Sequence, residues 1–245
     1  MPASVNGYGD IGVGEYSIGD NMVSIVSVSG KKFLYKRVSG GVVVCEKIIA
    51  GFTELRLVPL YPLLYPKYIT DYILVELEKT IDIAPGIEID FYIEVPVDIA
   101  LYAYHGREFR VIDSIPLSKP KYTLYGKPSE GVIARYTRSP IHANKPSPAM
   151  GKALGCVKAR NKTREWVTLS KILLSADNLR LHYREGSWMA CIQDIEVNID
   201  SPQTATVTYS KPSWEDVKPI DEPPIFRQPR IQTRLILRTD MLWGI

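Results

Sequence analysis

The sequence has few of the residues that build reactive or cross-linked sites. Of its 245 residues, only three are cysteine and three are histidine. The cysteines are Cys45, Cys156 and Cys191, and the histidines are His105, His142 and His182. No CxxC pair and no HxH, HxxxH or HExxH spacing occurs, which disfavours a zinc site and a disulfide framework. We therefore expect free thiols, no metal site and no cofactor.

Recognisable catalytic motifs are also missing. There is no GxSxG elbow, no GxxxxGK[ST] phosphate loop, and no GxGxxG that follows a strand. Acid and base carboxylates are assigned by distance, so Asp82, Asp98 and Asp113 receive no role from the sequence. The absence of these motifs favours a non-catalytic protein, and we assign no catalytic residue. An enzyme for a small anionic or carbohydrate substrate stays open, and it would need His105 or His142 beside a carboxylate in a pocket.

Long apolar runs are absent, and none approaches the ~18 residues of a membrane-spanning helix. The first residues, MPASVNGYGDIGVGEY, lack the basic start and apolar stretch of a secretory signal. We therefore expect a cytoplasmic protein without a membrane span.

The net charge of +3 is small but unevenly distributed. Residues 1–120 carry 11 Lys and Arg against 15 Asp and Glu, whereas residues 121–245 carry 19 against 12. A basic half that interleaves arginine with aromatics, as at Arg135-Tyr136 and Arg164/Trp166, could stack on single-stranded nucleic acid. Without a known nucleic-acid-binding module, and with a pI near 8.6, this partner is disfavoured and stays an alternative.

The residues that are abundant indicate β-structure. Fifteen tyrosines suit pleated surfaces, and 18 prolines and 17 glycines suit tight turns. The most apolar stretch, Leu55–Tyr104, reads as the centre of a β core. Within it, apolar residues alternate with polar ones over Ile87–Val95, the period of a strand. Its carboxylates Glu88, Asp90 and Glu94 could hold calcium, but a polar strand face more often meets water.

These patterns predict an all-β fold of two packed sandwich-like units, with mostly antiparallel strands and little helix. The Pro- and Ser-rich stretch after residue 140 divides a larger domain, 1–140, from a smaller one, 150–211. Residues 212–245 are expected to form a Pro-rich connector and a C-terminal docking strand, Ile231–Arg238. Trp166–Leu174 fits either a strand or one face of a helix.

A second marked segment, KYTLYGKPSEGVIARY, crowds tyrosine, glycine and proline into a short span before a strand. Its glycines permit unusual backbone, and its cations and aromatic rings could contact a partner. The predicted binding residues are Tyr125, Lys127, Arg135, Tyr136 and Arg138. The alternative is that the glycines only build a tight turn and the tyrosines fill the core.

Three stretches resemble an uncharacterised archaeal family, a domain of unknown function: LVPLYPLLYPKYITDYILVELEKTIDIAPG, EVPVDIALY and KYTLYGKPSEGVIARY, of which LYGKPSEGVIARY is the most specific part. The similarity covers most of residues 8–212. It implies a mostly β fold, and some relatives carry the domain on a small-conductance-type mechanosensitive channel. This chain departs from that arrangement because it has no membrane segment. The resemblance brings no catalytic residues.

The function is therefore unknown from the sequence, and we expect a non-catalytic binding, scaffold or regulatory module. Its partner would be another protein, or a second copy joined through the C-terminal segment.

Overall fold

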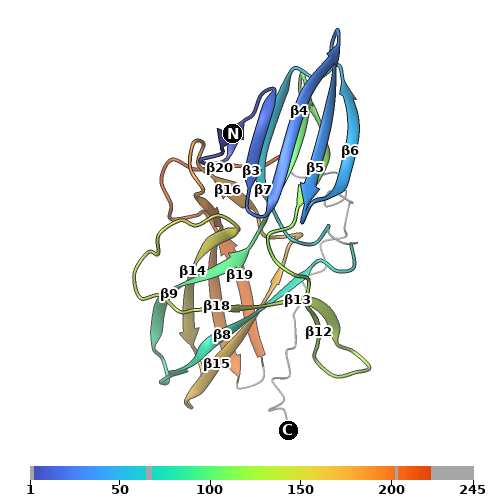
Figure 1. Cartoon of the computed structure of the whole chain (residues 1–245). Helices are drawn as coiled ribbons and strands as arrows, with labels where there is room; N and C mark the ends of the chain where they lie inside the picture. Colours follow the sequence, from blue (N-terminus) through green and yellow to red (C-terminus); the bar gives the residue numbers. More distant parts are fainter. Residues whose placement is uncertain (1–2, 65–67, 202–203, 222–245) are drawn as a thin grey trace.

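The computed structural model describes residues 3–64, 68–201 and 204–221, and in this part of the chain every regular element is a strand. Sheet I is the antiparallel stack at the N-terminal end of the molecule, with a short parallel strand at its edge (Figure 1). Its order is β1 (Ala3–Ser4), β3 (Gly14–Ile18), β4 (Asn21–Ser29), β5 (Lys32–Ser39) and β6 (Val42–Ala50). The turn between β5 and β6 uses Gly40 and Gly41, both with positive φ, as a tight two-residue hairpin requires.

Sheet II is antiparallel and lies against sheet I. Its order is β11 (Glu108–Ile115), β10 (Asp98–His105), β7 (Glu54–Leu60) and β2 (Gly9–Asp10). The buried Tyr35 and Arg37 of β5 reach Asp113 of β11, with the Tyr35 hydroxyl 2.7 Å from a carboxylate oxygen. Strands β6 and β11 each lie at the end of their sheet, on the same side of this sandwich.

Two further sheets form the other end of the molecule (Figure 1). Sheet III has the order β12 (Tyr122–Tyr125), β13 (Val132–Ser139), β8 (Tyr72–Ile83) and β15 (Val167–Ser175). Sheet IV has the order β19 (Thr204–Ser210), β18 (Asp194–Ser201), β14 (Lys152–Asn161), β17 (Ala190–Ile192), β16 (Leu181–Tyr183) and β20 (Lys218–Pro219), with β9 (Glu88–Pro96) on β14. Strand β13 is parallel to β8, and β14 is parallel to β17 and β18; the other pairs in these sheets are antiparallel.

One large apolar core runs through the sheets. Strand β9 shows the alternation that the sequence predicts, since Phe91, Ile93 and Val95 are buried while Glu88 and Asp90 are exposed. Burying such side chains is the main favourable contribution to folding, at about 25 cal/mol per Å² of apolar surface. This core is continuous between the two ends of the molecule.

The predicted all-β class is confirmed. The ambiguity at Trp166–Leu174 is resolved as a strand, because β15 pairs with β8 along most of its length. The division into domains 1–140 and 150–211 stays a prediction about separate folding. Strands from both sides of it share sheets: β9 pairs with β14, and β8 pairs with β15. The predicted docking strand Ile231–Arg238 lies outside the described residues.

Among the described residues there is no helix with the length and apolar character that crossing a membrane requires.

Candidate functional site

The predicted binding segment forms the hairpin of β12 and β13. Gly131 is required there for space, since a Cβ atom would lie 2.7 Å from the carbonyl oxygens of both Lys127 and Tyr125. The Lys127 carbonyl accepts hydrogen bonds from the amides of Glu130 and Gly131 and so closes the turn. The glycine therefore builds a tight turn, which is the alternative to partner binding that the sequence left open.

The two tyrosines of this segment are partly buried. Tyr125 and Tyr136 pack against a small cluster formed by Leu74, Ala134 and Leu173. The Tyr136 hydroxyl donates to Glu76 Oε2 at 2.8 Å. These rings cover sheet III and leave only part of their surface for a partner.

The two arginines have different environments. Arg135 is only 2% exposed, and one of its Nη atoms donates to the hydroxyl of Ser118 at 3.1 Å. Its guanidinium also lies 5.7 Å from the ring centroid of Tyr122. Arg138 is exposed, as is Lys127. The predicted binding role stays a prediction, and its accessible cations are Lys127 and Arg138.

A buried carboxyl group lies near Arg135. Asp98 is 1% exposed and accepts a hydrogen bond from the Leu117 amide at 3.2 Å. Burial raises the pKa of Asp98 to about 7, and the Leu117 bond and the charges of Arg135 and Arg37 oppose this rise without cancelling it. The group titrates in the physiological range from inside the core.

This raised pKa predicts that stability falls as the pH rises. The pKa of Asp98 is 3.8 in the reference state and about 7 when folded, so the folded state holds the proton more tightly between those values. Stability is then lost from about pH 4 to about pH 7, and no more is lost above that. Because asparagine does not titrate, we expect Asp98→Asn to lose about 5 °C less in Tm than the wild type between pH 5 and pH 8.

Thermal melts of both proteins across this pH range measure the difference. The exposed Asp90 provides the matched control, and Asp90→Asn should keep the wild-type pH dependence. Parallel curves for Asp98→Asn and the wild type would contradict the assignment.

The enzyme alternative needs His105 or His142 beside a carboxylate in a pocket, and the structure meets this requirement only in part. His142 Nε2 lies 3.0 Å from Glu94 Oε1, and Lys152 bonds the other oxygen of the same carboxylate. His105 lines a groove that also contains Glu108. The pKa of His182 is lowered, chiefly by burial.

Metal and nucleic-acid sites were the other possibilities raised by the sequence. In residues 3–64, 68–201 and 204–221, no group of three or more His, Cys, Asp or Glu side chains is arranged to hold a metal ion. Among the aromatics of the basic half, Tyr183 is buried whereas Trp166 is exposed. Tyr183 therefore contributes to the core and offers no face to a base.

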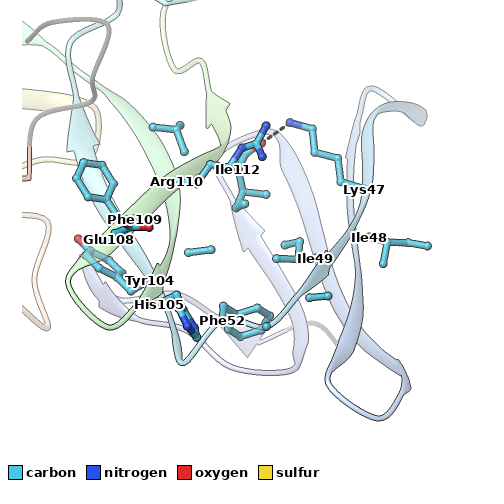
Figure 2. Close-up of a pocket in the computed structure, with 14 residues that line it drawn as sticks. Lys47, Ile48, Ile49, Phe52, Tyr104, His105, Glu108, Phe109, Arg110 and Ile112 are labelled. Atoms are coloured by element: carbon cyan, nitrogen blue, oxygen red, sulfur yellow. Dashed lines mark hydrogen bonds between the residues drawn. The ribbon is translucent and has the colours of Figure 1, made fainter.

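A groove of about 810 Å³ lies between β6 and the β10–β11 hairpin (Figure 2). Its lining includes Ile49 and Phe52 on one side and His105 on the other. The Lys47 side chain reaches from β6 across to the carbonyl oxygen of Ile112 on β11 (Figure 2). No motif in the sequence marks this groove, because its walls come from strands about 60 residues apart.

The outer face of sheet I is apolar and uncovered among the described residues. Register places Met22, Val38 and Val43 in one cross-strand row, and Val26, Leu34 and Ile48 in a second row. Met22, Val26, Val43 and Ile48 are exposed, and Ile48 is 68% exposed. Between the rows lie Ser24, Lys36 and Glu46. We call this surface, formed by these nine residues, the outer face.

Sequence reasoning missed the outer face, although a signal was present. The stretches MVSIVSV and VVVCEKII carry apolar residues on both sides of a strand, whereas a strand with one solvated face alternates. Contiguous exposed apolar patches on soluble proteins mark interaction surfaces. The outer face brings four exposed large apolar side chains, Met22, Val26, Val43 and Ile48, onto one side of sheet I.

Comparisons with known proteins identify a family and add no activity. No curated protein and no solved structure matches the chain. Residues 7–241 match the family described as "Protein of unknown function (DUF432)". This match extends beyond residue 212, where the resemblance from the sequence ended. Because it spans nearly the whole chain, the protein belongs to this family of unknown function.

Proposed function

We propose that this protein is a binding and scaffold module that assembles with a second copy of itself through the outer face of sheet I. The observation that carries the proposal is the pair of exposed apolar rows on β4, β5 and β6. Removing such rows from water is the usual driving force of protein association. The proposal assumes a reducing compartment such as the cytoplasm, since all three cysteines are free thiols.

The charges on the outer face favour a second copy as the partner. Lys36 and Glu46 are direct cross-strand neighbours in the central row. A two-fold axis parallel to the strands, between β5 and β6, places Lys36 of each copy opposite the partner's Glu46. The same rotation sets Leu34 opposite the partner's Ile48. Such an interface is self-complementary, as an isologous dimer requires.

Charge reversal tests this arrangement. Lys36→Glu would place carboxylates against carboxylates, and like charges across an interface cost several kcal/mol. We expect dimerisation to weaken by at least ~100-fold, and the double variant Lys36→Glu/Glu46→Lys to restore it. Light scattering coupled to size exclusion, run over a range of protein concentrations, measures both.

The apolar rows are tested with a matched pair of substitutions. Ile48 on the outer face and Trp166 elsewhere are both 68% exposed. Ile48→Lys should give a monomer, whereas Trp166→Lys should behave as the wild type. A wild-type protein that is monomeric at all concentrations would refute self-assembly. Dissociation by Lys36→Glu without rescue by the double variant would refute the two-fold arrangement.

A further inference from the structure

The two faces of sheet III belong to different apolar clusters. Ile73 and Val75 of β8 are part of the main core. Leu74, between them, belongs to a separate small cluster with Ala134 of β13 and Leu173 of β15. Because successive side chains of a strand point to opposite sides, this small cluster lies on the side of sheet III that faces away from the main core.

Three tyrosines surround the small cluster. Tyr72 of β8, Tyr125 of β12 and Tyr136 of β13 pack against it, and each is partly exposed. The register pairs Tyr136 with Leu74, two positions from Tyr72, so the backbones of these two tyrosines lie about 8 Å apart on neighbouring strands. The rings therefore come from three strands and form a platform across the sheet.

Exposed cations border these rings. The register pairs Glu76 with Arg138 on one side and with Lys171 on the other, and both cations are exposed. The Glu76 carboxylate accepts the hydrogen bond of the Tyr136 hydroxyl. A third exposed cation, Lys121, lies beside Tyr136, whose amide donates to the Lys121 carbonyl oxygen at 2.9 Å. We call this surface the tyrosine face, and it consists of Tyr72, Tyr125, Tyr136, Lys121, Arg138 and Lys171.

The tyrosine face combines two kinds of contact that single-stranded nucleic acid makes. Its three cations outweigh the carboxylate of Glu76, and all three come from the basic half of the chain, residues 121–245. Unpaired bases stack on aromatic rings presented by a β-sheet, while lysine and arginine contact the phosphates. The carboxylates of an acidic peptide would match the cations alone, and a neutral sugar would match the rings alone. The combination of rings and cations therefore favours nucleic acid.

We propose that the tyrosine face binds single-stranded nucleic acid, with bases stacked on Tyr72 and Tyr136 and with phosphates held by the three cations. The row that runs from Lys121 across β13 and β8 to β15 crosses three strand spacings, which is about 14 Å. This length suits a short stretch of nucleotides. The tyrosine face lies on sheet III and is separate from the outer face of sheet I, so the two surfaces are tested independently.

Fluorescence anisotropy with the full chain and labelled oligo(U) or oligo(dT) of about 12 nucleotides measures the binding to RNA and to DNA. Each phosphate contact with a single strand adds about −0.7 to the slope of log K against log salt, so three contacts give a slope near −2. Affinity should therefore fall about 20-fold between 50 and 200 mM salt. Absence of binding to both oligonucleotides at the lower salt concentration would overturn the proposal. Equal affinity for a duplex of the same length would also overturn it, because the bases of a duplex are not open to stacking.

Two variants separate the cations from the rings. Arg138→Gln/Lys171→Gln removes two phosphate contacts and should change the salt slope from about −2 to about −0.7. Tyr72→Leu keeps an apolar cover over Leu74 but removes a stacking ring, so it should weaken binding at least ~5-fold and leave the slope unchanged. Thermal melts show whether each variant is folded at the assay temperature. Wild-type affinity and slope in the folded Arg138→Gln/Lys171→Gln variant would overturn the proposal.

A matched control and a competitor locate the contact and identify its chemistry. Lys158 and Arg160 are exposed on β14 of sheet IV, so Lys158→Gln/Arg160→Gln changes the net charge equally without touching the tyrosine face. This control should bind as the wild type does, and an equal loss in both double variants would show attraction to the overall charge instead. Poly-glutamate is the acidic competitor. If it displaces the oligonucleotide and Tyr72→Leu binds as the wild type does, the face takes acidic chains without stacking, and the proposal is overturned.

Discussion

Asp113→Ala is expected to lower the free energy of unfolding by about 3–5 kcal/mol, because it leaves a buried cation without its partner. Arg37 is buried and bonds Asp113 through Nε at 2.6 Å and through Nη2 at 3.3 Å. The Tyr35 hydroxyl, also buried, donates to the same carboxylate. These bonds join β5 of sheet I to β11 of sheet II. Their loss therefore weakens the sandwich that carries the outer face and the groove.

Urea unfolding of the purified variants measures this loss. The second variant, Asp113→Ala/Arg37→Met, removes the cation together with the carboxylate. It should be more stable than Asp113→Ala alone, since an apolar side chain can replace a buried ion pair at little cost. Equal stability of the single and double variants would show that lost packing, and not an unpaired charge, causes the effect.

Arg135→Ala is expected to cost about 3 kcal/mol of stability, whereas Arg138→Ala should change it by less than ~0.5 kcal/mol. The Arg135 side chain is buried, and its removal leaves a void beside Tyr122 and the Ser118 hydroxyl without its donor. It also removes one of the charges that oppose the rise in the pKa of Asp98. Arg138, three residues later on β13, is exposed.

The same experiment decides the role that the sequence predicts for these arginines. A partner-binding arginine can be replaced without a large change in the melting temperature. If Arg135→Ala melts within a degree of the wild type, the expected contribution of Arg135 to stability is contradicted. Arg135→Met, which keeps the length of the stem, separates lost packing from lost charge.

Local sequence was sufficient wherever the signal lay within one hairpin. The alternation of Ile87–Val95 identifies β9 and its buried side, because successive side chains of a strand point to opposite faces. The consecutive glycines 40 and 41 identify a two-residue turn, because both positions need positive φ. The predicted class and most strands follow from such patterns.

The candidate binding residues show where that reasoning ended. Arg135 and Arg138 are three positions apart, so one strand cannot present both on the same face. The alternation shows this separation, but it does not show which of the two faces is covered. That depends on the parallel pairing of β13 with β8, a strand about 60 residues earlier in the chain. The sequence therefore predicted one binding surface for two arginines, of which the structure buries Arg135 and exposes Arg138.

By itself, the sequence determined that this protein is built from strands and tight turns, and that few of its residues suit metal or nucleophilic chemistry. Only the tertiary structure decided that β9 pairs with β14, that β6 and β11 border a groove, and that Asp98 is buried. The physical reason is range. Turn geometry and alternation act over a few residues, whereas pairing and burial depend on contacts between segments that are distant in the chain.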